Sequence, residues 1–202
     1  MIAIVDYGLG NVQAFANIYK RLNIAVQVAL VAADLDGADK VILPGVGAFD
    51  WAMSRLEASG MRPVLNSLVL KQGRPVLGVC VGMQMMARRS DEGVLPGLGW
   101  FDAEVKRFDE TNFESKTHLP HMGWNDVVPI ADSLFVGMES PRFYFLHSYY
   151  FEVGVPAQTI ATTDYNVAFT SAVSNGNIFG VQFHPEKSHH WGVQLLKNFA
   201  EM

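Results

Sequence analysis

The chain has 202 residues, of which half are hydrophobic and 17% are charged. This composition supports a sizeable core and excludes an intrinsically disordered protein. The formal net charge of -5 argues against binding to nucleic acid or to an anionic membrane surface. The lone cysteine suits a reducing compartment, and we find neither a basic leader nor an apolar run of the roughly 20 residues that a membrane span needs. We therefore expect a cytoplasmic protein with one domain over residues 1–202.

The first half of the chain alternates short apolar segments with amphipathic ones. Residues 2–5 are apolar and β-branched, as in a strand buried on both faces, and residues 12–22 carry apolar side chains at helical spacing. The order of strand, glycine loop and helix recurs at residues 39–56. Residues 61–73 then predict a helix and residues 75–79 a strand. Such alternation predicts a mostly parallel sheet covered by helices on both faces.

The second half reads as several strands with short links. The segments 100–108, 142–153, 158–165 and 168–183 have strand-like patterns, and the sequence "SNGN" inside the last of them predicts a hairpin. An amphipathic helix is expected at residues 189–202. Together the halves predict an α/β fold with a parallel core and antiparallel additions.

The only cysteine lies in the sequence Gly78-Val79-Cys80-Val81-Gly82. This has the spacing of the G-x-S-x-G nucleophile elbow, with sulfur in place of oxygen. On a sharp strand-to-helix turn, glycines two residues before and after the nucleophile prevent crowding. We expect a helix over residues 81–89, whose N-terminus would favour a thiolate. The alternative is a buried structural cysteine.

A second segment, "GVQFHPEKS" at residues 180–188, offers a base for the thiol. An apolar strand should end at His184, and Glu186 can turn back to hold one ring nitrogen, which is the logic of a catalytic triad. The alternative is a strand-end histidine with an ordinary hydrogen bond. The sequence "PGVG" at residues 44–47 ends another strand, and its N–H groups could bind an oxyanion together with the N–H of Val81. By itself it could be an ordinary turn.

These three segments, in this order, resemble the class I (triad) glutamine amidotransferases. Further similarity lies in "DYGLGN" at residues 6–11, "LPHMGWN" at 119–125 and "YFLHSYYF" at 144–151, so the resemblance covers essentially the whole chain. These segments are most similar to the branch of the family that supplies ammonia for histidine biosynthesis. The resemblance implies a single-domain, flavodoxin-like, three-layer α/β/α fold that needs no cofactor and no metal.

The resemblance also implies a role for each site residue. Cys80 would attack the side-chain amide of glutamine, His184 would transfer the proton, and Glu186 would orient the ring. The remaining contacts are Val46, Gly47 and Val81 for the oxyanion, and Gln84, Glu92, Ser148 and Tyr149 for glutamine. Glu92 would take the ammonium group of glutamine, while Ser148 and Tyr149 would act mostly through backbone atoms.

A partner is implied by the same resemblance. Members of this branch form a heterodimer with a (β/α)8-barrel cyclase subunit, which receives the ammonia, and they have low glutaminase activity until the cyclase site is occupied. Asn11, Trp124, Tyr144 and Lys187 match positions facing that barrel. Their alternative roles are a helix cap for Asn11, core packing for the two aromatic residues and a solvated charge for Lys187.

Two other functions remain open from the sequence. One is a sister amidotransferase that serves anthranilate or aminodeoxychorismate synthesis, and the other is a non-catalytic flavodoxin-like binding module.

Two weaker sequence patterns do not support a site. The sequence "GLGNVQ" lacks the third glycine of a dinucleotide site. His118 and His121 have no cysteine or carboxylate set nearby that would complete a metal site.

Overall fold

The computed structural model describes residues 1–113, 117–131 and 133–202. The helices in these ranges are α1 (Val12–Arg21), α2 (Phe49–Ala58), α3 (Arg62–Asn66), α4 (Val81–Gln84) and α5 (His189–Glu201). The strands are β1 (Ile2–Val5), β2 (Val26–Ala29), β3 (Lys40–Gly45), β4 (Val76–Cys80), β5 (Arg89–Ser90), β6 (Ala103–Arg107), β7 (His121–Asp126), β8 (Val128–Pro129), β9 (Arg142–His147), β10 (Tyr149–Val153), β11 (Thr159–Asp164), β12 (Ala168–Asn175) and β13 (Ile178–Val181). No helix within the described ranges has the length and apolar character to cross a membrane.

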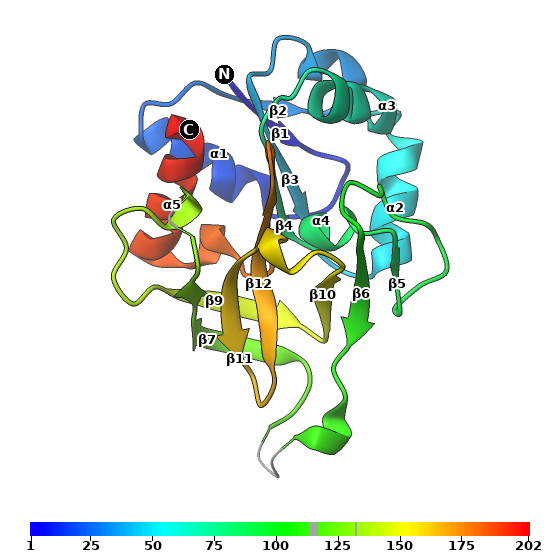
Figure 1. Cartoon of the computed structure of the whole chain (residues 1–202). Coiled ribbons are helices and arrows are strands. Elements are labelled where there is room, and N and C mark those ends of the chain that lie inside the picture. The colour runs from blue at the N-terminus through cyan, green and yellow to red at the C-terminus, as the bar shows by residue number, and fades with distance from the viewer. Residues whose placement is uncertain (114–116, 132) are drawn as a thin grey trace.

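The parallel half of the main sheet has the strand order β2-β1-β3-β4-β13. This is the order of a flavodoxin-like doubly wound sheet. Helices α1 and α5 lie on one side of these strands, and α2 and α3 lie on the other (Figure 1). The predicted three-layer, mostly parallel fold is therefore confirmed.

The register of the parallel strands brings the three motif segments to one edge of the sheet. Gly45 of β3 pairs with Cys80 of β4, and Val181 of β13 pairs with Val79. Because parallel strands end at the same edge, the "PGVG" turn and the "FHPEKS" segment both follow directly beside Cys80. Topology alone thus makes a site from residues more than 130 positions apart in the sequence (46 to 184).

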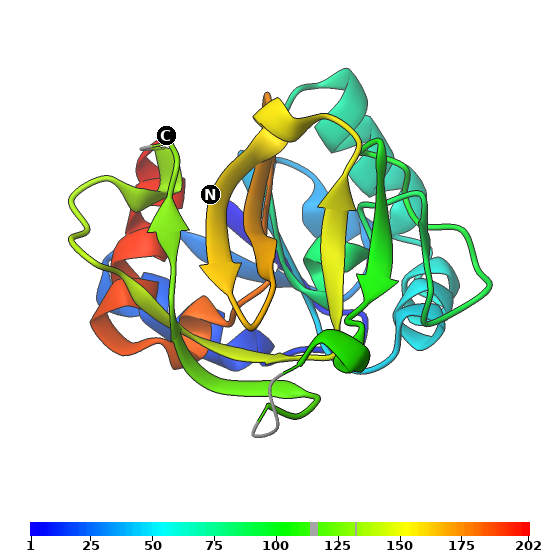
Figure 2. The ribbon, with the colours of Figure 1, turned by 60° about the horizontal axis from the view of Figure 1, so that its bottom comes forward.

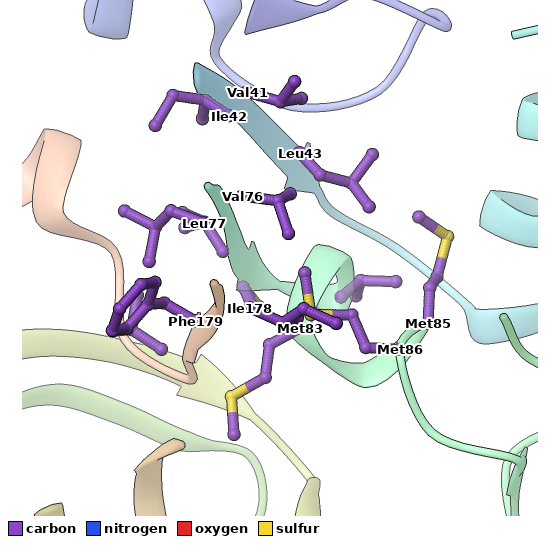
Figure 3. Close-up of a cluster of buried hydrophobic side chains, with 14 of the residues drawn as sticks. Val41, Ile42, Leu43, Val76, Leu77, Met83, Met85, Met86, Ile178 and Phe179 are labelled. Carbon is purple, nitrogen blue, oxygen red and sulfur yellow. The ribbon is translucent and has the colours of Figure 1, made fainter. Parts of the chain in front are cut away.

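The apolar runs of the central strands form the core under this edge. Val41, Ile42 and Leu43 of β3 are all fully buried, so consecutive side chains on both faces of the strand are covered. Met83 of α4 and Met86, which follows it, belong to the same cluster of buried side chains (Figure 3). This packing fixes the turn between β4 and α4, which carries Cys80.

The antiparallel additions predicted for the second half are also present. β12 and β13 form the expected hairpin around Gly176, whose φ of +59° is one that favours glycine. From β12 the sheet continues through β10, β6 and β5, while β11 and β8 attach at its side. β7 and β9 form a separate two-stranded sheet that lies at the lower edge of the view in Figure 2.

The segment 142–153, which the pattern predicts as one strand, is divided at Ser148. β9 pairs with β7 in the small sheet, whereas β10 pairs with β6 and β12 in the large one. The carbonyl of Ser148 accepts a hydrogen bond from the N–H of Phe108, which ties the crossing point to the end of β6. An alternating pattern cannot show this change, because both halves have the same period of two.

The helix expected over residues 81–89 is wrong in length, since α4 ends at Gln84. The carbonyl oxygens of Met85, Met86 and Ala87 accept hydrogen bonds from the N–H groups of residues 98, 101 and 99. These carbonyls therefore do not continue a helical ladder, and residues 89–90 join β5. A single helical turn has little macrodipole, so what it offers the thiol is mainly its free N–H groups.

Candidate active site

Cys80 is on a strained turn between β4 and α4. Its backbone has φ +56° and ψ -114°, a conformation that residues with a side chain rarely adopt. A Cβ atom at Gly82 would lie 1.9 Å from the carbonyl oxygen of Leu43, and one at Gly78 would lie 2.8 Å from the carbonyl oxygen of Gly82. Both glycines are required by close backbone approach, as the elbow pattern predicts.

His184 and Glu186 form a buried pair next to this turn. His184 Nδ1 lies 2.9 Å from Glu186 Oε1, and each side chain is 2% exposed. A short 3-10 turn over Pro185–Lys187 folds the carboxylate back onto the ring. Because a carboxylate accepts, Nδ1 carries the proton and Nε2 remains for another partner. The N–H of His184 also donates to the carbonyl of Tyr144, which fixes the backbone.

The surroundings of His184 favour its charged form. Burial opposes the charge, but hydrogen bonds and charge interactions with Cys80 and Glu186 outweigh it and raise the pKa of His184 to about 10. The ring is therefore protonated at neutral pH. An imidazolium beside Cys80 stabilises negative charge on the sulfur, which is the nucleophilic form.

A cavity of about 310 Å³ opens at this edge of the sheet. Its size is at the lower end of the roughly 300–1,000 Å³ typical of small-ligand sites. It brings together the proposed nucleophile, base, oxyanion and substrate residues: Val46, Gly47, Cys80, Val81, Gln84, Glu92, Ser148, Tyr149 and His184. Glu186 lies behind His184 and does not line the cavity. The cavity is thus lined by a thiol, an imidazole and a carboxylate, with the glycine turn beside them.

The Gln84 side chain is oriented by the protein itself. Its Nε2 donates to the carbonyl of Tyr149 at 3.1 Å and to Gln182 Oε1 at 3.0 Å. Both amide hydrogens are then used, so Oε1 is the atom available to the cavity. Gln84 can accept a hydrogen bond from a ligand there but has no hydrogen left to donate.

Glu92 accepts a hydrogen bond from the start of α2, and the loop that follows Glu92 is held by Asp50, which sequence reasoning missed. Glu92 Oε2 accepts from the N–H of Phe49 at 2.8 Å, and burial, partly offset by this bond, raises the pKa of Glu92. The carboxylate of Asp50 accepts from the N–H groups of Val94 and Leu95 at 2.9 and 3.0 Å, which anchors the loop following Glu92. Asp50 lies in the first turn of α2, and an acidic residue at the start of a helix is the sequence feature that could have drawn attention to it.

A buried histidine pair was also missed. His147 Nδ1 lies 2.8 Å from the carbonyl of Tyr149, so it must carry a proton, and His147 Nε2 then accepts from His121 Nδ1 at 2.9 Å. His121 Nε2 accepts from Asn125 Nδ2 at 3.2 Å. Each ring nitrogen has a partner, and both rings are neutral. His118, which shares a possible ligand spacing with His121, is exposed instead.

This histidine pair predicts a loss of stability in acid. Burial lowers the pKa of His147 to about 3 and that of His121 to about 4, from an ordinary value of 6.5. Between the lowered pKa values of the folded state and the ordinary value of 6.5, the unfolded chain binds more protons than the folded one. The contribution of the two neutral histidines to the free energy of unfolding is therefore complete above pH 6.5 and is lost as pH falls toward 3.

Urea unfolding from pH 7.5 to 4 should show a falling free energy of unfolding. The decline should be shallower in His147→Gln and unchanged in a control, His190→Gln, at an exposed position. Equal slopes in all three proteins would contradict the prediction.

The four residues matched to a partner face all have exposed or partly exposed side chains. Trp124 of β7 pairs with Tyr144 of β9, and Lys187 Nζ lies 5.6 Å from the centre of the Tyr144 ring. Trp124 is 40% exposed and stacks on His189, so the alternative of core packing is wrong for it. Asn11 precedes α1 and is exposed, and its side chain makes no capping hydrogen bond.

Comparison with known proteins identifies the class to which this fold and site belong. The sequence model of the family "Glutamine amidotransferase class-I" matches residues 3–202, and the chain belongs to this family. A solved structure described as a glutamine amidotransferase has a TM-score of 0.75 at 18% identity, with 100% of this chain and 99% of that chain covered. At this identity the likeness shows the fold.

Within the family, the chain is similar over its full length to particular curated proteins. It is 60% identical to "Imidazole glycerol phosphate synthase subunit HisH" of Bdellovibrio bacteriovorus and 51% identical to the protein of the same name from Leptospira interrogans. In both cases 100% of each chain is covered.

Proposed function

We propose that this protein is the glutaminase subunit of an imidazole glycerol phosphate synthase. Its residues 1–202 would act as one glutamine amidotransferase domain that hydrolyses glutamine to glutamate and ammonia. The observation that carries the proposal is the buried His184–Glu186 pair beside a thiol on a strained elbow, at one end of a cavity. The names of the full-length relatives support the choice of synthase.

In the first half of the reaction, the Cys80 thiolate attacks the side-chain carbonyl carbon of glutamine. The carbonyl oxygen becomes an oxyanion, for which the N–H groups of Val81 and of the Val46–Gly47 turn are donors. Protonated His184 passes its Nε2 proton to the departing nitrogen. The C–N bond breaks, ammonia leaves, and a glutamyl thioester on Cys80 remains.

In the second half, neutral His184 takes a proton from water, and the hydroxide attacks the thioester carbon. The C–S bond then breaks, glutamate leaves and the thiolate returns beside the imidazolium. Glu186 holds the ring in one tautomer through both halves and stabilises its charge. The α-ammonium group of glutamine would be held by Glu92 and by Oε1 of Gln84.

The ammonia would pass to a (β/α)8-barrel cyclase subunit in a heterodimer rather than escape to water. There it would be joined to a phosphorylated ribulosyl intermediate to give imidazole glycerol phosphate and an aminoimidazole carboxamide ribotide. Asn11, Trp124, Tyr144 and Lys187 would face that subunit. A shared dry interface keeps ammonia unprotonated and nucleophilic. Reaction in the cytoplasm agrees with a lone reduced cysteine.

The experiment that tests the proposal measures glutamate release by the full chain, alone and with a barrel cyclase subunit plus its ribonucleotide. We expect low turnover alone and a large increase in the complex. A partner from anthranilate or aminodeoxychorismate synthesis should give no increase, and an increase with that partner would transfer the assignment to the sister enzymes. A thiol that a glutamine-like electrophile fails to label even in the complex would leave only a non-catalytic binding module.

Asp50 provides a test of the substrate wall. Asp50→Asn weakens the two charge-assisted bonds to residues 94 and 95, so the loop that follows Glu92 loses its anchor. We expect the KM for glutamine to rise about tenfold, with a smaller change in kcat, because the loop binds substrate and does not touch the amide. Steady-state kinetics of the complex measures both constants. Glu57→Gln, on the exposed face of the same helix, is the control and should match the wild type. A fall in kcat alone would contradict this role for Asp50.

A further inference from the structure

The side chain of Gln182 contacts the sulfur of Cys80. Gln182 follows β13, two residues before His184, and it is completely buried. Its Nε2 lies 3.7 Å from Cys80 Sγ. A buried amide needs hydrogen-bond partners, and the sulfur is the acceptor that the described residues offer to this NH₂ group.

The orientation of this amide is determined by neighbouring groups. The carbonyl of Tyr149 can only accept, so the atom of Gln84 that faces it at 3.1 Å must be Nε2. The same Nε2 lies 3.0 Å from Gln182, which must therefore present Oε1 to Gln84. Gln182 is left with Nε2 toward the sulfur. The Tyr149 carbonyl is itself fixed by His147 Nδ1, so the whole series has one direction.

The sulfur has a different partner in each of its two states. As a thiol it can donate to the carbonyl oxygen of Leu146, which lies 3.9 Å away. As a thiolate it has no proton to donate, and that carbonyl then faces a negative charge. Gln182 Nε2–H and protonated His184 are the donors that an anionic sulfur retains.

We propose that Gln182 is a further catalytic residue, whose amide N–H stabilises the anionic sulfur of Cys80 from the side of the sheet. The inference rests on the proposed function and adds to it a neutral donor that works in two steps. It would stabilise the attacking thiolate, and it would do so again when the C–S bond of the thioester breaks and the electron pair returns to sulfur. A neutral donor does this without competing with His184 for a proton.

The test uses the full chain, in which the single cysteine makes alkylation by iodoacetamide report on one site. Gln182→Glu keeps the acceptor for Gln84 and replaces the donor by oxygen, whereas Gln182→Met keeps the approximate volume and removes both. Loss of a hydrogen bond to a charged group changes the equilibrium constant for forming that charge by roughly ten- to a hundredfold. We therefore expect alkylation at pH 7 to slow by about tenfold or more and its pH midpoint to rise by about one unit, with the larger effect in Gln182→Glu.

The groups that also titrate or carry charge near the sulfur are His184, Tyr7, Glu92 and His147 and, behind the ring, Glu186. All of them are retained in both variants, but Gln182→Glu adds a carboxyl group beside the sulfur. Gln182→Met adds no titratable group, so the shift of its profile reports on the loss of the amide. In the complex, kcat/KM for glutamine should fall in parallel. Ser171→Ala is the control, because Ser171 is equally buried on the neighbouring strand and its hydroxyl has no partner among the described residues. Its alkylation profile should match the wild type.

Alkylation profiles of both Gln182 variants that superimpose on the wild type would overturn the proposal, even if their unfolding midpoints change. If neither variant folds, Gln84→Met tests the same series from its other end, since it frees the Gln182 amide to rotate; an unchanged profile there would also overturn it. Glutamine hydrolysis by the wild type is measured separately. Normal hydrolysis with unaffected Gln182 variants would reject this role alone and leave the proposed function standing.

Discussion

Cys80→Ser should abolish glutamine-dependent synthesis by the complex, with a loss of roughly 10⁴-fold or more in kcat. The hydroxyl that replaces the thiol is far less acidic than the thiol. It therefore does not ionise beside protonated His184, and no anionic nucleophile forms. Hydroxyl and thiol are close in size, and the elbow should keep its conformation. Glutamate release and cyclase product formation from glutamine are the measurements.

Ammonia supplied from solution provides the control for this variant. The cyclase active site is on the partner, so product formation from added ammonium salt should stay near the wild-type value. A Cys80→Ser complex that still uses glutamine at an appreciable rate would refute the thioester mechanism. Loss of both activities would indicate a failed assembly, and gel filtration of the complex would then show free subunits.

Gly82→Ala should cost the protein about 3 kcal/mol or more of unfolding free energy. The added methyl group would lie 1.9 Å from the carbonyl oxygen of Leu43, which is backbone of the central strand β3 and cannot move aside without disturbing the core. Urea unfolding at neutral pH measures the change. Glutamine hydrolysis should be lost as well, because β4 and the helix after Cys80 can no longer keep their close approach to the oxyanion turn.

Gly60→Ala separates this steric effect from the general cost of losing a glycine. Gly60 follows α2 with φ +70°, and a methyl group added there would have no atom within 4 Å, so alanine introduces only backbone strain of about 1–2 kcal/mol. Activity should remain. Equal destabilisation by the two substitutions would show that crowding at the elbow is not what requires Gly82.

The sequence predicts the reactive groups of the candidate site more fully than the contacts that support them. Cys80, His184 and Glu186 stand in short motifs whose spacing carries a physical meaning, so they can be identified from the chain. The contacts of Gln182 and Asp50 cannot be found in this way. Gln182 acts on a sulfur more than 100 positions away, and Asp50 holds a loop 44 positions away. Only the fold makes either pair adjacent.

The elements of secondary structure show the same division. Strands with continuous apolar runs and the hairpin at Gly176 were predicted, because burial on both faces and a left-handed turn leave local signatures. The length of α4 and the break at Ser148 were not. After α4, the carbonyl groups of residues 85–87 accept hydrogen bonds from the N–H groups of residues 98, 99 and 101 instead of continuing the helix. At Ser148 the chain passes from one sheet to the other without a change in its period of two.

Residue types and local order were determined by the sequence alone: a thiol on a glycine-flanked turn, a carboxylate two positions after a histidine, and a parallel α/β core. Tertiary structure decided the ionisation of His184, the neutral state of the His121–His147 pair and the direction of the amides that lead to Cys80. The physical reason is that charge and hydrogen-bond direction depend on which groups share a buried space. Chain order does not contain that information until strand register has brought the groups together.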